Sequence, residues 1–174
     1  MTTSRSHAAL LAVALAALAC DEGLLPQSSC PPGFLGICGT VTFRGALPDS
    51  TDVVYVVAYA TFPANQSDLF TFQPLSPPTL HLDSASRATP QPYTLALPAG
   101  TYHWVLAAWK KLGTLSPQNA DSLLREAGHY RDPMDTSKIG TVAVAGAVTG
   151  VDFTVDFTNM HPVSYFFPAS PLHP

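Results

Sequence analysis

Charged side chains are scarce in this chain of 174 residues. Asp, Glu, Lys and Arg together make up 11% of it, and only eight residues are Lys or Arg. The net charge is −4 and the sequence has no basic cluster, which argues against nucleic acid or an anionic lipid surface as a partner. A hydrophobic fraction of 47% with 17 prolines is typical of an ordered domain with proline-rich connections.

A hydrophobic run long enough to span a bilayer is also lacking. The uncharged run at residues 8–19 has twelve residues, whereas a spanning helix needs about 20. It follows Arg5 and ends in the letters AALAC, which resembles the lipobox of bacterial lipoproteins. The resemblance implies a signal peptide at 1–19, cleavage before Cys20 and lipidation of Cys20. The alternatives are an ordinary secretory signal with a free Cys20 thiol, and a retained anchor helix.

If the signal peptide is removed before Cys20, acyl chains would hold the protein to a membrane. Cleavage removes Arg5 and no acidic residue, so the net charge of the mature chain becomes −5. Such a surface repels anionic headgroups, and membrane association would come from acyl chains. We therefore expect a lipid-anchored protein of the bacterial cell envelope that faces the periplasm or the cell exterior. Residues 20–37, which are acidic and then rich in Ser and Pro, are predicted to be a tether.

Cysteine is rare as well, with three residues in the whole chain. If Cys20 carries lipid, Cys30 and Cys38 remain as a pair in an oxidising compartment. The segment between them contains Pro31, Pro32 and two glycines, which favour a bend. The sequence predicts a disulfide between Cys30 and Cys38, with two buried thiols as the alternative.

What the chain has in abundance is strand-like patterning. Residues 93–111 read as two strands around the turn residues 98–100, and we expect a central hairpin there. The apolar run at 52–62 predicts a second central strand, because both of its faces are hydrophobic. Residues 151–157 alternate strictly between apolar and polar side chains, as in a half-buried strand. A helix is expected near 117–127, with Ser116 as its N-cap and Gly128 as its stop.

Several of these segments together resemble one fold family. The stretches GTVTFRGALP, VVYVVAY, LPAGTY and GTVAVAGAVTGVDFTVDF are similar to the carboxypeptidase regulatory-like, or prealbumin-like, β-sandwich. The resemblance implies an all-β fold: an antiparallel two-sheet β-sandwich of about seven strands, plus one short helix near 117–127. The sandwich domain is expected at 38–158 and an apolar, proline-rich C-terminal tail at 159–174. Domains of this kind serve as accessory, adhesive and binding modules, so the resemblance reports fold more than activity.

Catalytic and metal-binding motifs are not found. There is no GxSxG, SxxK or HExxH pattern, and the histidines are scattered. Asp152 and Asp156 on one strand would lie about 13 Å apart, too far for a pair of glycosidase carboxylates. The sequence therefore predicts no catalytic residue, no metal site, no cofactor and no enzymatic activity.

Two sets of residues remain as candidate binding sites. The first is the tail segment with Val163, Tyr165, Phe166 and Phe167, which is costly to leave in water; it either packs on its own domain or docks on a partner. The second is an aromatic strip in which Trp109 with Lys111 is the best ligand-binding candidate, and core packing is the alternative.

The expected function is that of a non-enzymatic, lipid-anchored envelope protein. It would act as a binding or scaffolding module, as an accessory subunit of a membrane-associated assembly with an envelope protein as its partner. The alternative is a carbohydrate- or small-ligand-binding module that uses the aromatic strip.

Overall fold

The protein has an all-β fold. A computed structural model describes residues 30–167, so the predicted signal peptide, Cys20 and the last seven residues lie outside the described part. The strands, in chain order, are β1 (Gly36–Arg44), β2 (Thr51–Tyr59), β3 (Gln91–Ala96), β4 (Gly100–Tyr102), β5 (Trp104–Lys111), β6 (Leu124–His129), β7 (Arg131–Asp132), β8 (Asp135–Ile139), β9 (Val142–Val144), β10 (Ala147–Val148), β11 (Phe153–Asp156) and β12 (His161–Pro162). Short helical segments lie in the connections: η1 (Gln66–Phe70), α2 (Ser84–Arg87), η2 (Pro117–Asn119), α3 (Ala120–Leu123) and α4 (Val163–Phe166).

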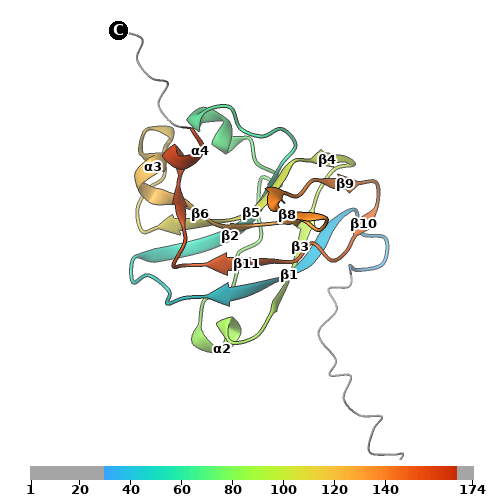
Figure 1. The fold of residues 1–174 in the computed structure, drawn as a ribbon, viewed down its shortest axis with the longest axis horizontal. Coiled ribbons are helices and arrows are strands. Elements are labelled where there is room, and N and C mark those ends of the chain that lie inside the picture. Colours follow the sequence, from blue (N-terminus) through green and yellow to red (C-terminus); the bar gives the residue numbers. More distant parts are fainter. Residues whose placement is uncertain (1–29, 168–174) are drawn as a thin grey trace, which may run out of the picture.

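Two four-stranded sheets contain most of the strands (Figure 1). In one of them, β1 pairs with β3 antiparallel and with β10 and β11 in parallel. In the other, the order is β12-β6-β5-β2 and every pair is antiparallel. The parallel pairs correct the expectation of a purely antiparallel fold. Period-2 alternation reports which face of a strand is buried, and it carries no information on the direction of the neighbouring strand.

The predicted hairpin over 93–111 is wrong. Strand β3 belongs to the sheet of β1, whereas β5 lies between β2 and β6 in the other sheet. The chain crosses between them through β4, which pairs with β9. The Tyr102 hydroxyl donates a hydrogen bond to the Pro98 carbonyl oxygen at 3.0 Å and closes this corner. The turn residues at 98–100 suit a crossing between sheets as well as a hairpin, so the local sequence did not distinguish the two.

The predicted central position of the 52–62 run is wrong, because β2 is the last strand of its sheet, but the prediction that both of its faces are buried is confirmed. Val54, Val56 and Ala58 of β2 lie in the large core to which both four-stranded sheets contribute. Val57 and Tyr59 lie in a second buried cluster on the opposite face. The outer edge of β2 is covered by the proline-rich connection, because residues 73, 78 and 80 hydrogen-bond with its backbone.

The predicted helix near 117–127 is only partly present. Pro117 begins η2 and α3 ends at Leu123, after which the chain becomes strand β6. Gly128 does not end a helix; it lies within β6, where an added Cβ would collide with the carbonyl oxygen of Thr154. Pairing with β5 replaces the helical pattern in this segment, since tertiary contacts routinely override local propensity.

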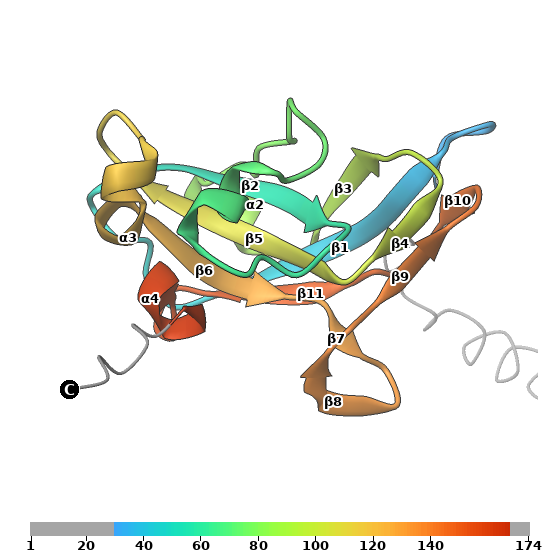
Figure 2. The same ribbon diagram turned by 90° about the horizontal axis from the view of Figure 1, so that it is seen from above.

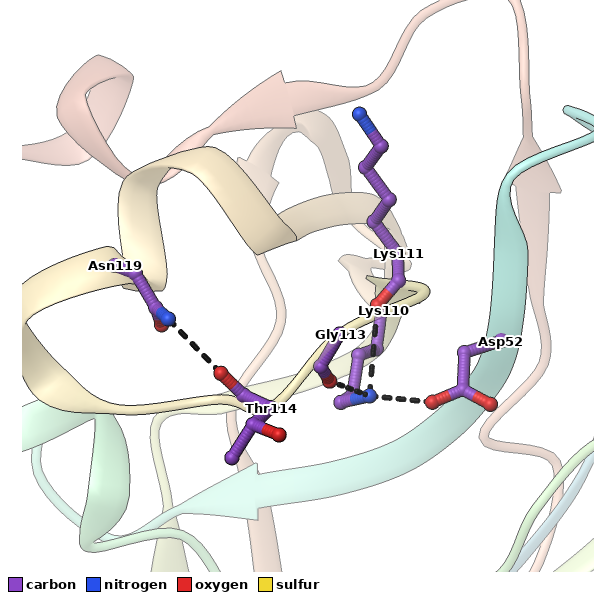
Figure 3. Close-up of polar contacts among 6 residues, drawn as sticks. All are labelled: Asp52, Lys110, Lys111, Gly113, Thr114 and Asn119. Carbon is purple, nitrogen blue, oxygen red and sulfur yellow. Dashed lines mark hydrogen bonds and ion pairs between the residues drawn. The ribbon is translucent and has the colours of Figure 1, made fainter.

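A lysine fixes the loop between β5 and η2 (Figure 3). The Lys110 ammonium contacts the carboxylate of Asp52 and donates to the Gly113 carbonyl oxygen at 2.8 Å. The amide of Asn119 donates to the Thr114 carbonyl oxygen at 2.9 Å. These bonds join the end of β5 to the start of β2 and to the turn that leads into α3.

The two ends of the described chain lie at opposite ends of the domain. Cys30 lies beside β10, with its Sγ 3.7 Å from the carbonyl oxygen of Val148, and α4 lies at the far end of the domain from β10, next to α3 (Figures 1 and 2). The β7–β8 hairpin projects from the body of the domain between them (Figure 2). Within residues 30–167, no helix is long and apolar enough to cross a membrane.

Candidate functional site

A buried carboxylate on β6 forms hydrogen bonds with two histidines, one on β6 and one on β12. The side chain of Glu126 is 4% exposed. Its Oε1 lies 3.1 Å from Nδ1 of His129, and its Oε2 lies 2.8 Å from Nδ1 of His161. Each carboxylate oxygen is therefore matched to one imidazole.

A bulge in β6 explains why Glu126 and His129 meet. In a regular strand, residues three apart point to opposite faces. The pairing with β5 shifts by one residue here, because Ala107 faces Gly128 while the next residue, Ala108, faces Glu126. The extra residue, Ala127, reverses the alternation, and so Glu126 and His129 lie on the same face.

The histidines keep Glu126 ionised. Burial raises the pKa of its carboxyl group. Hydrogen bonds from His129 and His161, together with the electrostatic interaction with these two residues, lower it by more, so the net pKa lies below the usual range. A carboxylate only accepts hydrogen bonds, so both Nδ1 atoms must carry a proton. In the neutral rings, each Nε2 is then an acceptor.

These three side chains line a cleft of about 490 Å³. Its walls come from β6, the β7–β8 hairpin, β11 and the segment that leads to β12. The lining residues are Arg44, Glu126, Ala127, Gly128, His129, Tyr130, Arg131, Asp132, Pro133, Thr136, Gly150, Asp152, Phe153, Thr154, Asp156, Asn159 and His161. A volume of this size falls within the range of small-molecule sites, about 300–1,000 Å³.

Acidic residues and one tyrosine shape the electrostatics of the cleft. Oδ1 of Asp152 accepts hydrogen bonds from the backbone N–H and the hydroxyl of Thr40, at 2.6 and 2.9 Å. Hydrogen bonds from Thr158 lower the pKa of Asp156, and the charge of Arg44 lowers it further. The pKa of Tyr130 is raised by burial and by the charges of Asp132 and Asp152, so its hydroxyl remains a donor.

The aromatic side chains of the predicted strip are buried and do not form an exposed surface. Trp109 is 5% exposed and belongs to the large core, where its Nε1 donates to the Thr51 hydroxyl at 2.8 Å. Trp104 and Tyr59 lie in the cluster on the other face of the sheet. Lys111 is exposed, and its side chain points away from the contacts around Lys110 (Figure 3). Strand alternation divides these aromatic residues between two buried faces, so Trp109 packs in the core, which was the alternative to a ligand-binding strip.

The tail packs on its own domain. Val163 is buried, and the ring of Phe166 lies 4.9 Å from that of Trp104. The backbone N–H of Ser164 donates to Asp121 at 2.7 Å. The segment forms the single turn of α4. Phe167 is half-buried, and Tyr165, at 62% exposed, is the residue of the predicted partner site that is open to solvent.

The two predicted disulfide cysteines are brought together. Cys30 and Cys38 are joined by a disulfide with a Cα–Cα distance of 5.5 Å, which lies in the usual range for such bonds. Cys20, the predicted lipidation site, lies outside the described residues. Among residues 30–167, no group of three or more His, Cys, Asp or Glu side chains could hold a metal ion.

Sequence reasoning missed the Glu126 cluster. Glu126 lay within the expected helix. His129 and His161 belonged to the scattered histidines that match no metal-binding motif. His161 is 35 residues away in sequence, and the bulge that turns His129 toward Glu126 has no sequence signature of its own. Gly128, whose backbone lies close to the Thr154 carbonyl oxygen, was the one local sign of the bulge, but a glycine at this position also fits the end of a helix.

Comparison with protein-family models, with curated proteins and with solved structures found no match for this chain. The resemblance to regulatory-like sandwiches consequently depends on the sequence motifs alone.

Proposed function

We propose that the protein is a non-enzymatic, lipid-anchored component of the bacterial cell envelope that acts as a binding or scaffolding module. In this proposal the two four-stranded sheets form the two-sheet sandwich of the carboxypeptidase regulatory-like type. Acyl chains on Cys20 hold the domain to a membrane, and the domain faces the periplasm or the cell exterior.

The observation that carries the proposal is the disulfide between Cys30 and Cys38. Disulfides persist in oxidising compartments, which agrees with export of the chain. The bond uses two of the three cysteines and leaves Cys20, ten residues before Cys30, as the cysteine at the end of the signal-like segment. That is the position at which lipoproteins carry their acyl group.

The scaffolding part of the proposal is supported by an aromatic surface at the far end of the domain. Tyr165 is 62% exposed and Phe62 is 37% exposed, and both contact the half-buried ring of Phe166. Cys30 contacts Val148 of β10, and α4 lies at the opposite end of the domain from β10 (Figure 1), so an anchor ahead of Cys30 would direct this surface away from the membrane. It would then be available to another envelope protein.

Fractionation of cells that produce the full chain tests the anchor. We expect the protein in the membrane fraction with an acylated Cys20 at its N-terminus, and the Cys20→Ala variant in the soluble fraction. Leu112→Ala, an exposed residue outside the signal segment, is the matched control. An unmodified N-terminus in mass spectra would overturn the lipoprotein assignment.

The partner contact has its own test. A photo-crosslinking residue at position 165 should form a defined adduct with one envelope protein, and the same residue at the exposed position 134 should not. Equal labelling from both positions would contradict a specific contact at Tyr165.

A further inference from the structure

We infer that the cleft around Glu126 is a binding site for a neutral, polyhydroxylated ligand, that is, a mono- or disaccharide. This inference deepens the proposed binding role and rests on it, but it does not depend on lipidation of Cys20. It also differs from the aromatic-strip hypothesis, because none of the strip residues lines this cleft.

The cleft contains a costly polar arrangement. Burial of an ionised carboxylate is unfavourable unless it is fully hydrogen-bonded, and well-packed apolar residues commonly serve stability as well or better. Glu126 nevertheless lies at the wall of an open cleft and holds two imidazoles in fixed orientations. An arrangement of this kind positions His129 and His161 for contact with a ligand.

The remaining hydrogen-bonding capacity of the lining fits hydroxyl groups. Nε2 of each neutral imidazole is an acceptor, because Nδ1 is used by Glu126. Among the described contacts, Asp152 uses only Oδ1, for Thr40, and Asp132 uses only Oδ1, for the N–H of Met134. The guanidinium of Arg131 uses one nitrogen, for the Thr136 carbonyl oxygen, and keeps other donors. Groups that both donate and accept, such as adjacent sugar hydroxyls, satisfy this mixed set.

The charges in the lining argue against a strongly charged ligand. Each oxygen of Glu126 already has an imidazole as its hydrogen-bond partner, and Asp156 has Arg44 at 4.0 Å. Asp132 and Asp152 would repel a phosphate, while the guanidinium of Arg131 would repel a diamine. The half-buried Tyr130 adds an aromatic ring against which the C–H face of a sugar can pack.

Calorimetric titration with a panel of sugars tests the inference. The full chain, purified from whichever cell fraction holds it, is titrated with cellobiose, maltose, lactose, chitobiose and N-acetylglucosamine, each up to about 10 mM. We expect at least one of them to bind. Inorganic phosphate and putrescine are titrated in parallel, and binding of either one to the cleft in place of every sugar would overturn the inference.

Two variants locate the binding. Glu126→Gln places an amide N–H opposite one Nδ1, which forces that imidazole to move its proton to Nε2 and turns an acceptor into a donor. Asp152→Asn keeps the Oδ1 acceptor for Thr40 but changes the free oxygen. Each should weaken binding about tenfold or more, as expected for the loss of a hydrogen bond to a charged group. Asp135→Asn on β8, which does not line the cleft, is the matched control.

Folding of each variant is checked by its thermal melting curve and by circular dichroism. Asp152→Asn keeps the inference falsifiable if Glu126→Gln does not fold. Sugar binding that is unchanged in the folded variants, or no binding of any sugar by the wild type, would overturn it. Because the titration is done in solution, either result leaves the membrane location of the protein to its own test.

Discussion

The two faces of the β12-β6-β5-β2 sheet are both buried, but by different means. The inner face carries Val56, Val105 and Trp109, and other strands of the fold cover it. The outer face carries Val57, Trp104 and Leu106, and connections and the C-terminal segment cover it. The two tryptophans, one on each face, differ in whether the buried indole N–H has a hydrogen-bond partner. Nε1 of Trp109 has a hydrogen-bond partner, whereas Nε1 of Trp104, on a residue only 2% exposed, has none among the described residues.

The difference teaches that burial alone does not measure the quality of packing. Beneath the C-terminal segment is a cavity of about 40 Å³, lined in part by Trp104, Val163 and Phe166. An unsatisfied buried N–H costs about 1–3 kcal/mol. The cover over the outer face therefore fits less closely than the strands that cover the inner face, and we expect it to open more readily.

The largest effects are expected for leucine truncations, one in each cluster. Leu95→Ala in the large core should lower the free energy of unfolding by about 3–5 kcal/mol, because the surrounding strands cannot collapse into the cavity. Leu106→Ala on the outer face should cost about 2–3 kcal/mol, since the segment above it can move inward. Urea titration measures both values. Equal losses would remove the proposed difference between the faces.

Glu126→Gln should have a smaller effect that depends on pH. Glu126 joins β6 to β12, which leads into the cover, and its loss should cost about 1–3 kcal/mol at neutral pH. The folded pKa of Glu126 is lowered from its ordinary value of 4.5, so its contribution to stability is present above that value and is lost as the pH falls through the folded pKa. The difference between wild type and variant should therefore shrink as the pH is lowered to about 3. A difference that stays constant over this range would contradict the role of the ionised carboxylate. Asp135→Asn, on β8 and outside the cleft, is the control.

The smallest effects should separate the two tryptophans. Trp109→Phe loses the hydrogen bond to Thr51 and should cost about 1–2 kcal/mol more than Trp104→Phe, which removes an N–H that has no partner. Both substitutions remove a similar volume, so each serves as the control for the other. Thermal or urea unfolding gives the comparison. A larger loss for Trp104→Phe would show that its N–H is satisfied in solution.

The parts of the fold that could be predicted are those that depend on side-chain alternation. The VVYVVAY run of β2 and the FTVD segment of β11 revealed which residues are buried, because successive side chains of a strand point to opposite faces of the sheet. Strand partners were not predictable in the same way. β3 and β5 belong to different sheets although only a short turn and β4 separate them in sequence.

The candidate site depended on information that lies outside any local pattern. Glu126, His129 and His161 carry no spacing typical of a functional motif, and they meet through a register shift and a strand pair. The Cys30–Cys38 pair was easier to predict because the choice among three cysteines was small. For Trp109 the sequence left ligand binding and core packing open, because an aromatic residue on a strand gives no sign of whether its face is covered; the structure shows core packing.

The bulge at Ala127 makes the site depend on the number of residues in β6. A substitution at Ala127 leaves the count unchanged, so His129 would stay on the side of Glu126. Deletion of one residue would restore regular pairing with β5 and turn His129 to the opposite face. In evolutionary terms, the arrangement can be gained or lost in one insertion or deletion event, and a homologue could share almost every residue with this chain and still lack the paired imidazoles.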